Sequence, residues 1–381
     1  MKILTLCYEY PPVGGGGGRM AHQVSAGLVG LGHEVRVQTV RVGDIPSRER
    51  RDGVEIFRTF GFRRRADRCS VPEMGGFLAT SFLPALRHIS EWKPDVIHAH
   101  FAVPTGALAL ACRLLTGTPY MLTAHLGDLP GGNPDQTDSL FRFLNPAILP
   151  IWKNASAVSA SSSFAAGLAR TAYHIDPAII LNGVSMDGLA AKPRPASSPT
   201  ALVAIGRFHP QKNFLWMVEA LRGCEFPWRL TLIGDGGQRG EVEAAIARAG
   251  LGNRIRLMGW VPEQTMREVL EDSDILLMPS TSEGNPVAAI EALKRGLAIL
   301  GSDIGGLSDI LEDGGNGFAV SLAGPEAFRE RLAMLCRDPL LLEKMKSRSL
   351  AIATHFDLTT IVKQFERLLL DAALPGKNQV G

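Results

Sequence analysis

The chain has 381 residues, of which 45% are hydrophobic and 20% are charged. That length is too great for one ordinary hydrophobic core and suits two domains of roughly 150 to 200 residues each. With 40 basic and 38 acidic side chains, the net charge of +2 gives no reason to expect a nucleic-acid partner. The five cysteines are widely spaced and include no Cys-x-x-Cys pair, which favours a reduced, cytoplasmic environment.

Short β-rich runs alternate with longer helical patterns along the whole chain, a pattern typical of α/β proteins with parallel sheets. The predicted strands of the first half are Ile3–Tyr8, Glu34–Thr39, Val96–His100 and Tyr120–Ala124. Those of the second half are Ala201–Gly206, Arg229–Ile233, Ile275–Pro279 and Leu297–Gly301. The longest apolar stretch, 102–124, is interrupted by Pro104, Arg113 and Pro119, so no membrane span is expected.

A Pro- and Ser-rich segment, KPRPASSPT at 192–200, separates the two series of strands, because it suits neither a helix nor a central strand. We predict two Rossmann-like domains, 1–185 and 186–355, with a final amphipathic helix at about 356–373 that packs back on the first. The carboxyl ends of parallel strands bind ligands in such sheets. We therefore expect the two domains to face a central cleft.

A glycine-rich turn, Gly14–Gly18, follows the first predicted strand and leads into a helix. Backbone without Cβ atoms can approach a phosphate closely, and a helix N-terminus attracts negative charge. A dinucleotide-binding fingerprint is excluded, because Arg19 or Met20 stands where its third glycine should be. A diphosphate site and a flexible surface turn remain as alternatives.

Two cations follow a strand of the second half, on the loop Gly206-Arg207-Phe208-His209-Pro210-Gln211-Lys212-Asn213. Arg207 and Lys212 on one loop could clamp an anionic ligand. The alternative is a solvated basic loop.

The segment STSEGNPVAAIEAL at 280–293 contains the densest group of functional residue types. Asn285 is predicted as the N-cap and Pro286 as the first residue of a helix. Glu283 then lies just outside the helix, and Glu291 lies five residues beyond Pro286, roughly 7 to 8 Å along it. We interpret these carboxylates as acceptors for sugar and ribose hydroxyls on either side of an anion at the helix end.

Together these segments resemble the retaining glycosyltransferases of family 4, which have the GT-B fold. The motifs PPVGGGGGR, GRFHPQKN, SEGNPVAAIEAL and DIGGLSDILEDGGNGF stand where that family has such motifs, and the resemblance covers nearly the whole chain. It implies an acceptor-binding first domain, a second domain that binds a nucleotide-sugar donor, and a glycan or lipid-linked acceptor.

The resemblance also implies roles for single residues. Arg207 and Lys212 correspond to the clamp on the donor diphosphate, Glu291 to the acceptor of the ribose hydroxyls, and His125 to a histidine that contacts the sugar or its acceptor. The donor sugar would be held by Glu283 with Gly284, Asn285 and Pro286, and backbone amides would come from Gly17 and Gly18; Gly305-Gly306 resembles a close-approach turn. Two departures are Leu126, where many relatives have Gly, and Asp309, where relatives often have Glu.

No metal and no cofactor besides the nucleotide-sugar co-substrate are expected. The sequence Asp272-Ser273-Asp274 is similar to a metal-binding Asp-x-Asp, but it follows a helix and precedes a strand, on the wrong side for a loop ligand. His98 and His100 at a strand end are weaker candidates than His125. Two other functions remain open: a nucleotide-sugar epimerase, and a protein that binds a nucleotide sugar without turning it over.

A cluster of basic residues precedes an apolar-rich stretch at 75–89. It contains Arg48, Arg50, Arg51, Arg58, Arg63, Arg64, Arg65 and Arg68, opposed by four acidic residues. Basic residues beside an amphipathic helix suit an anionic membrane surface, and a solvated loop is the alternative. Family members that extend lipid-linked glycans often dock through the first domain, which would place this protein at the inner face of the cytoplasmic membrane.

Overall fold

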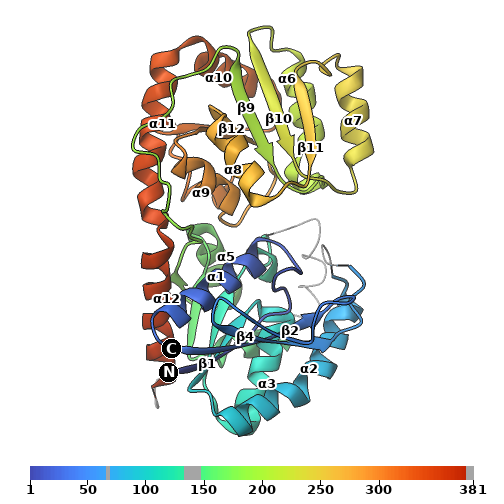
Figure 1. Cartoon of the computed structure of the whole chain (residues 1–381), viewed down its shortest axis with the longest axis vertical. Coiled ribbons are helices and arrows are strands. Elements are labelled where there is room, and N and C mark those ends of the chain that lie inside the picture. The colour runs from blue at the N-terminus through green and yellow to red at the C-terminus, as the bar shows by residue number, and fades with distance from the viewer. Residues whose placement is uncertain (66–68, 133–146, 375–381) are drawn as a thin grey trace. The chain divides into compact units, whose positions relative to one another are not determined.

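The computed structural model describes residues 1–65, 69–132 and 147–374 (Figure 1). It divides into two compact units, of which the first comprises Met1–Gly183 with Leu358–Gly381 and the second comprises Val184–Asp357. Each unit contains its own mainly parallel sheet, as predicted. Within the described ranges, no helix has both the length and the apolar composition to cross a membrane.

The first unit is built on an eight-stranded sheet with the order β3-β4-β2-β1-β5-β6-β7-β8, parallel throughout except for the β3–β4 pair. The sequence patterns correctly located β1, β2, β5 and β6 but missed the other four strands. The strand bounds are β1 (Lys2–Leu6), β2 (Glu34–Arg41), β3 (Arg48–Arg51), β4 (Val54–Phe60), β5 (Val96–His100), β6 (Tyr120–Ala124), β7 (Ala157–Ala160) and β8 (Ala178–Ile179).

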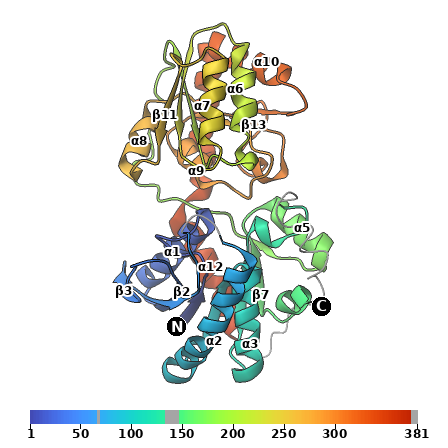
Figure 2. The same ribbon diagram turned by 90° about the vertical axis from the view of Figure 1, so that its right-hand side faces the viewer.

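Helices cover both faces of this sheet. Successive side chains of a strand point to opposite faces, and the buried strands carry apolar side chains on both. Ile3 joins the core beneath α1 (Gly16–Gly30) and α12 (Leu358–Ala373), whereas Leu4 joins the core beneath α2 (Val71–Trp92), α3 (Ala107–Thr116) and α5 (Ser163–Tyr173). Figure 1 shows α1 and α12 side by side, and Figure 2 shows α2 beside α3. A Cβ at Gly27 of α1 would lie 2.5 Å from Val362 of α12, so glycine permits this close packing.

Four arginines of the cluster lie in strands β3 and β4 rather than in a loop, namely Arg48, Arg50, Arg51 and Arg58, whereas Arg63, Arg64 and Arg65 follow β4 outside any strand. β3 and β4 pair antiparallel, and two of the arginines are buried. The Arg58 guanidinium donates to the carbonyl oxygens of Pro46 and Pro11 and pairs with Glu49 at 3.1 Å. The Arg63 side chain, only 1% exposed, donates to the carbonyl oxygen of Tyr8 and pairs with Glu9 at 3.4 Å. Arg68 lies outside the described residues. The exposed members of the cluster are Arg48, Arg50, Arg51, Arg64 and Arg65.

The second unit contains a six-stranded, fully parallel sheet with the order β11-β10-β9-β12-β13-β14. Its strands are β9 (Thr200–Ile205), β10 (Trp228–Ile233), β11 (Ile255–Gly259), β12 (Ile275–Met278), β13 (Ala298–Ser302) and β14 (Gly317–Val320). Its helices are α6 (Phe214–Arg222), α7 (Arg239–Arg248), α8 (Glu263–Glu271), α9 (Val287–Lys294), α10 (Glu326–Arg337) and α11 (Pro339–Ala353). Leu202 and Leu230 of the sheet pack in one core with residues of α6, α7, α10 and α11.

Candidate active site

The two predicted donor-binding segments follow neighbouring strands of the second sheet, β9 and β12, and are joined to each other. Gln211 makes both links: its side-chain amide donates to the carbonyl oxygen of Ser282 at 2.8 Å, and its own carbonyl accepts the N–H of Thr281 at 2.9 Å. The loop after β9 is therefore held against the segment that contains Glu283.

Lys212 and Glu283 are in direct contact. The Lys212 Nζ lies 2.5 Å from Glu283 Oε1, and the hydroxyl of Ser280 donates to the same oxygen at 2.6 Å. The Glu283 side chain is 7% exposed and that of Lys212 is 20% exposed. A Cβ at Gly206 would lie 3.0 to 3.2 Å from three carbons of the Lys212 side chain, so glycine leaves room for its stem. Arg207 is exposed on the same loop.

A second glycine-containing loop, Gly234-Asp235-Gly236, supports the loop that carries Arg207. The N–H of Phe208 donates to the carbonyl oxygen of Asp235 at 2.9 Å. Gly234 has φ +138°, and a Cβ there would overlap the carbonyl oxygen of Gly206, so only glycine fits this approach. The sequence patterns did not reveal this supporting role.

The helix after Glu283 begins later than predicted. α9 starts at Val287 with Pro286 as its N-cap, and Asn285 has a left-handed backbone with φ 85°. The prediction of Asn285 as N-cap and Pro286 as first helical residue was therefore wrong. Asn tolerates the left-handed region better than most residues, which lets it turn the chain into the helix. Gly284, Asn285 and Pro286 thus form the turn between Glu283 and the helix.

Glu291 on α9 is held by an arginine that sequence reasoning missed. Arg295 Nη1 lies 2.5 Å from Glu291 Oε2, and the Arg295 side chain is only 5% exposed. Its Nε also lies 3.7 Å from Glu271. The four-residue spacing on one helix, which brings Glu291 and Arg295 to one face, was the available signal. The pair orients the Glu291 carboxylate.

The Gly305-Gly306 turn approaches the backbone of Glu283. A Cβ at Gly306 would overlap the Glu283 carbonyl oxygen. Because only glycine permits this approach, the turn fixes the position of the Glu283 backbone.

In the first unit, Gly17 and His125 lie together at the carboxyl ends of β1 and β6. A Cβ at Gly17 would lie 2.7 Å from the Phe101 ring and 3.1 Å from the His125 ring. A Cβ at Gly18 would overlap the carbonyl oxygen of Glu9, whereas those at Gly15 and Gly16 would meet open space. The helix α1 begins at Gly16, so the glycine-rich turn does lead into a helix N-terminus.

His125 is oriented by its backbone and by Phe101. The backbone N–H of His125 donates to Asp128 Oδ2 at 2.8 Å, and Asp128 Oδ1 accepts the backbone N–H of Ala102 at 2.9 Å. The Phe101 ring stacks on the imidazole at a centroid distance of 4.2 Å. Burial lowers the pKa of His125 to about 4, so its ring is neutral at pH 7. Burial raises the pKa of Asp128 to about 7, although backbone hydrogen bonds from His125 and Ala102 act to lower it. Sequence reasoning missed Asp128 and Phe101.

His98 and His100 are completely buried beside His125. His98 Nε2 lies 2.8 Å from the hydroxyl of Thr123, and the His100 ring stacks on that of His125 at 5.7 Å. Because they are completely buried, His98 and His100 are less able than His125 to contact a ligand.

Asp272 and Asp274 do not act as a pair. Asp272 is the C-cap of α8, whereas Asp274 has a fully buried carboxylate that lies 2.8 Å from Lys346 Nζ and 3.0 Å from Arg194. Asp274 therefore belongs to a structural ion pair.

Two family models match the chain over most of its length. The description "Glycosyltransferase Family 4" fits residues 14–187, and "Glycosyl transferases group 1" fits residues 199–338. The chain belongs to the family 4 glycosyltransferases. This glycosyltransferase is 25% identical to Bacillus subtilis TuaC, assigned to teichuronic acid biosynthesis, over 81% of its own length and 83% of that protein.

Two solved structures establish the GT-B fold of this glycosyltransferase. Sucrose-phosphate synthase from Thermosynechococcus elongatus gives a TM-score of 0.82 at 18% identity, covering 96% of this chain and 98% of that one. Anabaena HepE in complex with UDP-glucose gives a TM-score of 0.73 at 20% identity, covering 97% and 99%.

Proposed function

We propose that this glycosyltransferase moves a sugar from a nucleotide diphosphate sugar to a hydroxyl of a polysaccharide or lipid-linked glycan, with retention at the anomeric carbon and without a metal. The observation that carries the proposal is the contact of Lys212 with Glu283 where the loops after β9 and β12 join. The assignment of TuaC to teichuronic acid synthesis and the UDP-glucose bound to HepE support the choice of acceptor and donor class.

Stabilisation of the leaving group supplies the catalysis in this proposal. The bond from the anomeric carbon to the diphosphate breaks, the acceptor oxygen bonds to the same carbon, and the acceptor proton passes to the departing diphosphate. Arg207 and Lys212 neutralise the charge that develops on this diphosphate, as fixed cations do in water-poor sites. Glu283 orients Lys212 and accepts hydroxyl hydrogens of the sugar. The neutral ring of His125 can donate a hydrogen bond to a sugar or acceptor hydroxyl, or accept one from it.

Product analysis tests this function directly. We expect a new glycoside with the anomeric configuration of the donor, formed only when an acceptor is present and at the same rate in EDTA. Nuclear magnetic resonance of the product measures the configuration. An altered donor without acceptor would indicate an epimerase, an unchanged donor under all conditions a binding protein, and loss of turnover in EDTA that magnesium restores a metal-dependent reaction.

The two glutamates should have separable effects. Glu291→Gln should weaken binding of the free nucleoside diphosphate, because Glu291 is assigned to the ribose, while Glu283→Gln should mainly impair use of the intact donor. The loss of one hydrogen bond to a charged group corresponds to about 1.5 to 3 kcal/mol, roughly 10- to 150-fold. Titration calorimetry with the free nucleotide and with the donor measures both; equal losses in the two variants would contradict the division. Gln is used because Ala at position 291 would leave Arg295 buried beside a gap.

We also propose that the first domain docks on anionic membrane through a surface formed by Phe60, Phe62, Arg64 and Arg65. The two phenylalanine side chains are 62% and 58% exposed, and their rings meet edge to face at 4.9 Å. Arg64 and Arg65 are exposed beside them in sequence. Aromatic rings beside cations suit the lipid headgroup region. Arg63 is left out because its side chain is buried.

Vesicle cosedimentation tests this docking surface. Phe60→Ser/Phe62→Ser and Arg64→Ser/Arg65→Ser should each reduce binding to anionic vesicles; each exposed basic residue contributes about 1 kcal/mol, or roughly fivefold. Binding of the parent should weaken in 1 M salt, where the Debye length falls to about 3 Å. Leu114→Ser/Leu115→Ser, which alters two exposed leucines of α3, is the control. Undiminished sedimentation of both test variants would overturn the proposal.

A further inference from the structure

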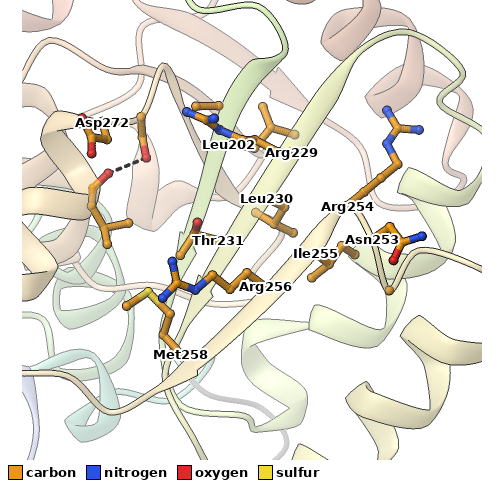
Figure 3. Close-up of a pocket in the computed structure, with 14 residues that line it drawn as sticks. Leu202, Arg229, Leu230, Thr231, Asn253, Arg254, Ile255, Arg256, Met258 and Asp272 are labelled. Atoms are coloured by element: carbon orange, nitrogen blue, oxygen red, sulfur yellow. Dashed lines mark hydrogen bonds between the residues drawn. The ribbon is translucent and has the colours of Figure 1, made fainter.

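A pocket of about 380 Å³ lies on the second sheet, between β9, β10 and β11 and the segment that follows α8 (Figure 3). None of its lining residues belongs to the donor-binding segments 206–213 or 280–293. Its volume lies within the range of small-molecule sites. The pocket is therefore separate from the candidate active site.

Two arginines on neighbouring strands line one side of this pocket. In the β10–β11 register Thr231 pairs with Arg256, so Arg229, two residues earlier, shares a face with both. From the strand spacing and the rise per residue, the Cα atoms of Arg229 and Arg256 are about 8 Å apart. Both side chains are exposed. Within the described part of the chain, neither guanidinium has a hydrogen-bond or ion-pair partner.

The third arginine that lines the pocket, Arg254, differs from these two because its guanidinium is bound to the backbone. Arg254 donates to the carbonyl oxygens of Trp228, Cys224 and Phe226, and its guanidinium lies 3.8 Å from the centroid of the Trp228 ring. In Figure 3 its side chain extends away from that of Arg256. Arg254 is thus committed to the fold, whereas Arg229 and Arg256 carry like charges that repel each other and that no ion pair offsets within the described residues.

Two polar groups of another kind lie at different ends of the pocket in Figure 3. Asp272, after α8, and Asn253, before β11, both line it. A carboxylate accepts hydroxyl hydrogens, an amide both donates and accepts, and guanidinium groups suit the oxygens of a phosphate. We propose that this pocket binds a monosaccharide phosphate, with the phosphate at Arg229 and Arg256 and the sugar hydroxyls at Asp272. A phosphate monoester is favoured over a carboxylate because its dianion can engage two separate guanidinium groups.

The competing explanation concerns the sheet edge. β11 is an edge strand, and exposed charges on edge strands prevent pairing with other chains. That role needs no ligand and does not account for Arg229, which lies on the inner neighbour β10. It predicts no binding of phosphate at this site.

Titration calorimetry on the full chain tests the site with glucose 6-phosphate, inorganic phosphate, glucuronate and glucose. We expect glucose 6-phosphate to bind more tightly than inorganic phosphate and than glucuronate, and glucose not to bind. Arg229→Gln and Arg256→Gln should each raise the Kd for glucose 6-phosphate about 10- to 100-fold. Asp272→Asn should raise it for glucose 6-phosphate but not for inorganic phosphate. The matched control, Arg222→Gln/Arg248→Gln, removes two exposed charges from α6 and α7 and should change neither.

A variant of the donor-binding loop distinguishes binding in this pocket from binding at the donor site. Arg207→Ala/Lys212→Ala should retain glucose 6-phosphate binding, since these residues do not line the pocket. Loss of binding in this variant but not in Arg229→Gln/Arg256→Gln would place the sugar phosphate at the donor clamp and overturn the inference. Absence of binding in the parent protein would do the same and would favour the edge-strand role. Neither result would bear on donor binding itself, which the glutamate variants measure.

Discussion

Replacing Arg207 and Lys212 together by Ala should lower kcat/KM by about 10²- to 10⁴-fold. Two charge-assisted contacts of roughly 1.5 to 3 kcal/mol each are removed, and tenfold in rate corresponds to about 1.4 kcal/mol. Lys212 also faces the nearly buried carboxylate of Glu283, whose hydroxyl partner Ser280 remains. Steady-state kinetics with donor and acceptor measures the effect.

The control for this variant is Arg222→Ala/Lys344→Ala, which removes one exposed arginine and one exposed lysine from other surfaces of the second unit. Its kinetics should match those of the parent. If the Arg207→Ala/Lys212→Ala protein is folded and turns over as fast as the control, the two cations do not clamp the diphosphate.

Acidification should destabilise the first unit through its buried histidines. Burial lowers the pKa of His98 to about 3 and that of His125 to about 4, and it lowers the pKa of His100 well below the usual value. Between about pH 6.5 and pH 4 the unfolded chain therefore binds protons that the folded chain does not, and the free energy of unfolding falls with falling pH. At pH 5, His98 and His125 each contribute about 2 kcal/mol to this loss, and His100 acts in the same direction.

Asp128 acts in the opposite direction. Because burial raises its pKa to about 7, the folded chain holds a proton there that the unfolded chain releases above about pH 4, and acidification from pH 7 relieves this penalty. The change at Asp128 is similar in size to that of one histidine, so a net loss of stability remains.

Amide hydrogen exchange of β5 and β6 at pH 7 and pH 5, corrected for intrinsic rates, measures the loss locally. His98→Gln preserves a partner for Thr123 and should reduce the difference between the two pH values by about 2 kcal/mol. His355→Gln, which changes an exposed histidine, is the control. An acid sensitivity that is the same in all three proteins would contradict the role of the buried imidazoles.

The loops of the site could be predicted from the sequence because glycine and proline mark them. Gly17, Gly18, Gly206 and Gly306 stand where the backbone must approach another group closely, and such positions show in a single sequence. The exact helix start at Val287 could not be predicted, since both Asn285 and Pro286 are compatible with several positions around a helix N-terminus.

What the sequence patterns missed depends on contacts between distant segments. Arg63 looks like its exposed neighbours in the sequence, but it is buried because Tyr8 and Glu9 supply acceptors from 55 and 54 residues away. The short strand β3, with the sequence RERR, consists only of charged residues, so its pairing with β4 rather than its composition makes it a strand. Phe101 and Asp128 likewise act on His125 only once β5 and β6 are paired.

The helix α12 belongs to the first unit but is the last of the described elements to be synthesised, so the first unit cannot complete its fold until nearly the whole chain has been made. Its residues Ile361, Phe365 and Leu369 complete the core beneath α1, yet they are translated long after the last strand of that sheet, β8. At 5 to 20 residues per second, the ribosome needs roughly 10 to 40 seconds to travel from β8 to α12. During that time the apolar face of α1 lacks its covering helix, and the nascent chain exposes a surface that chaperones bind. The second unit, which is continuous in the sequence, can therefore finish folding before the first.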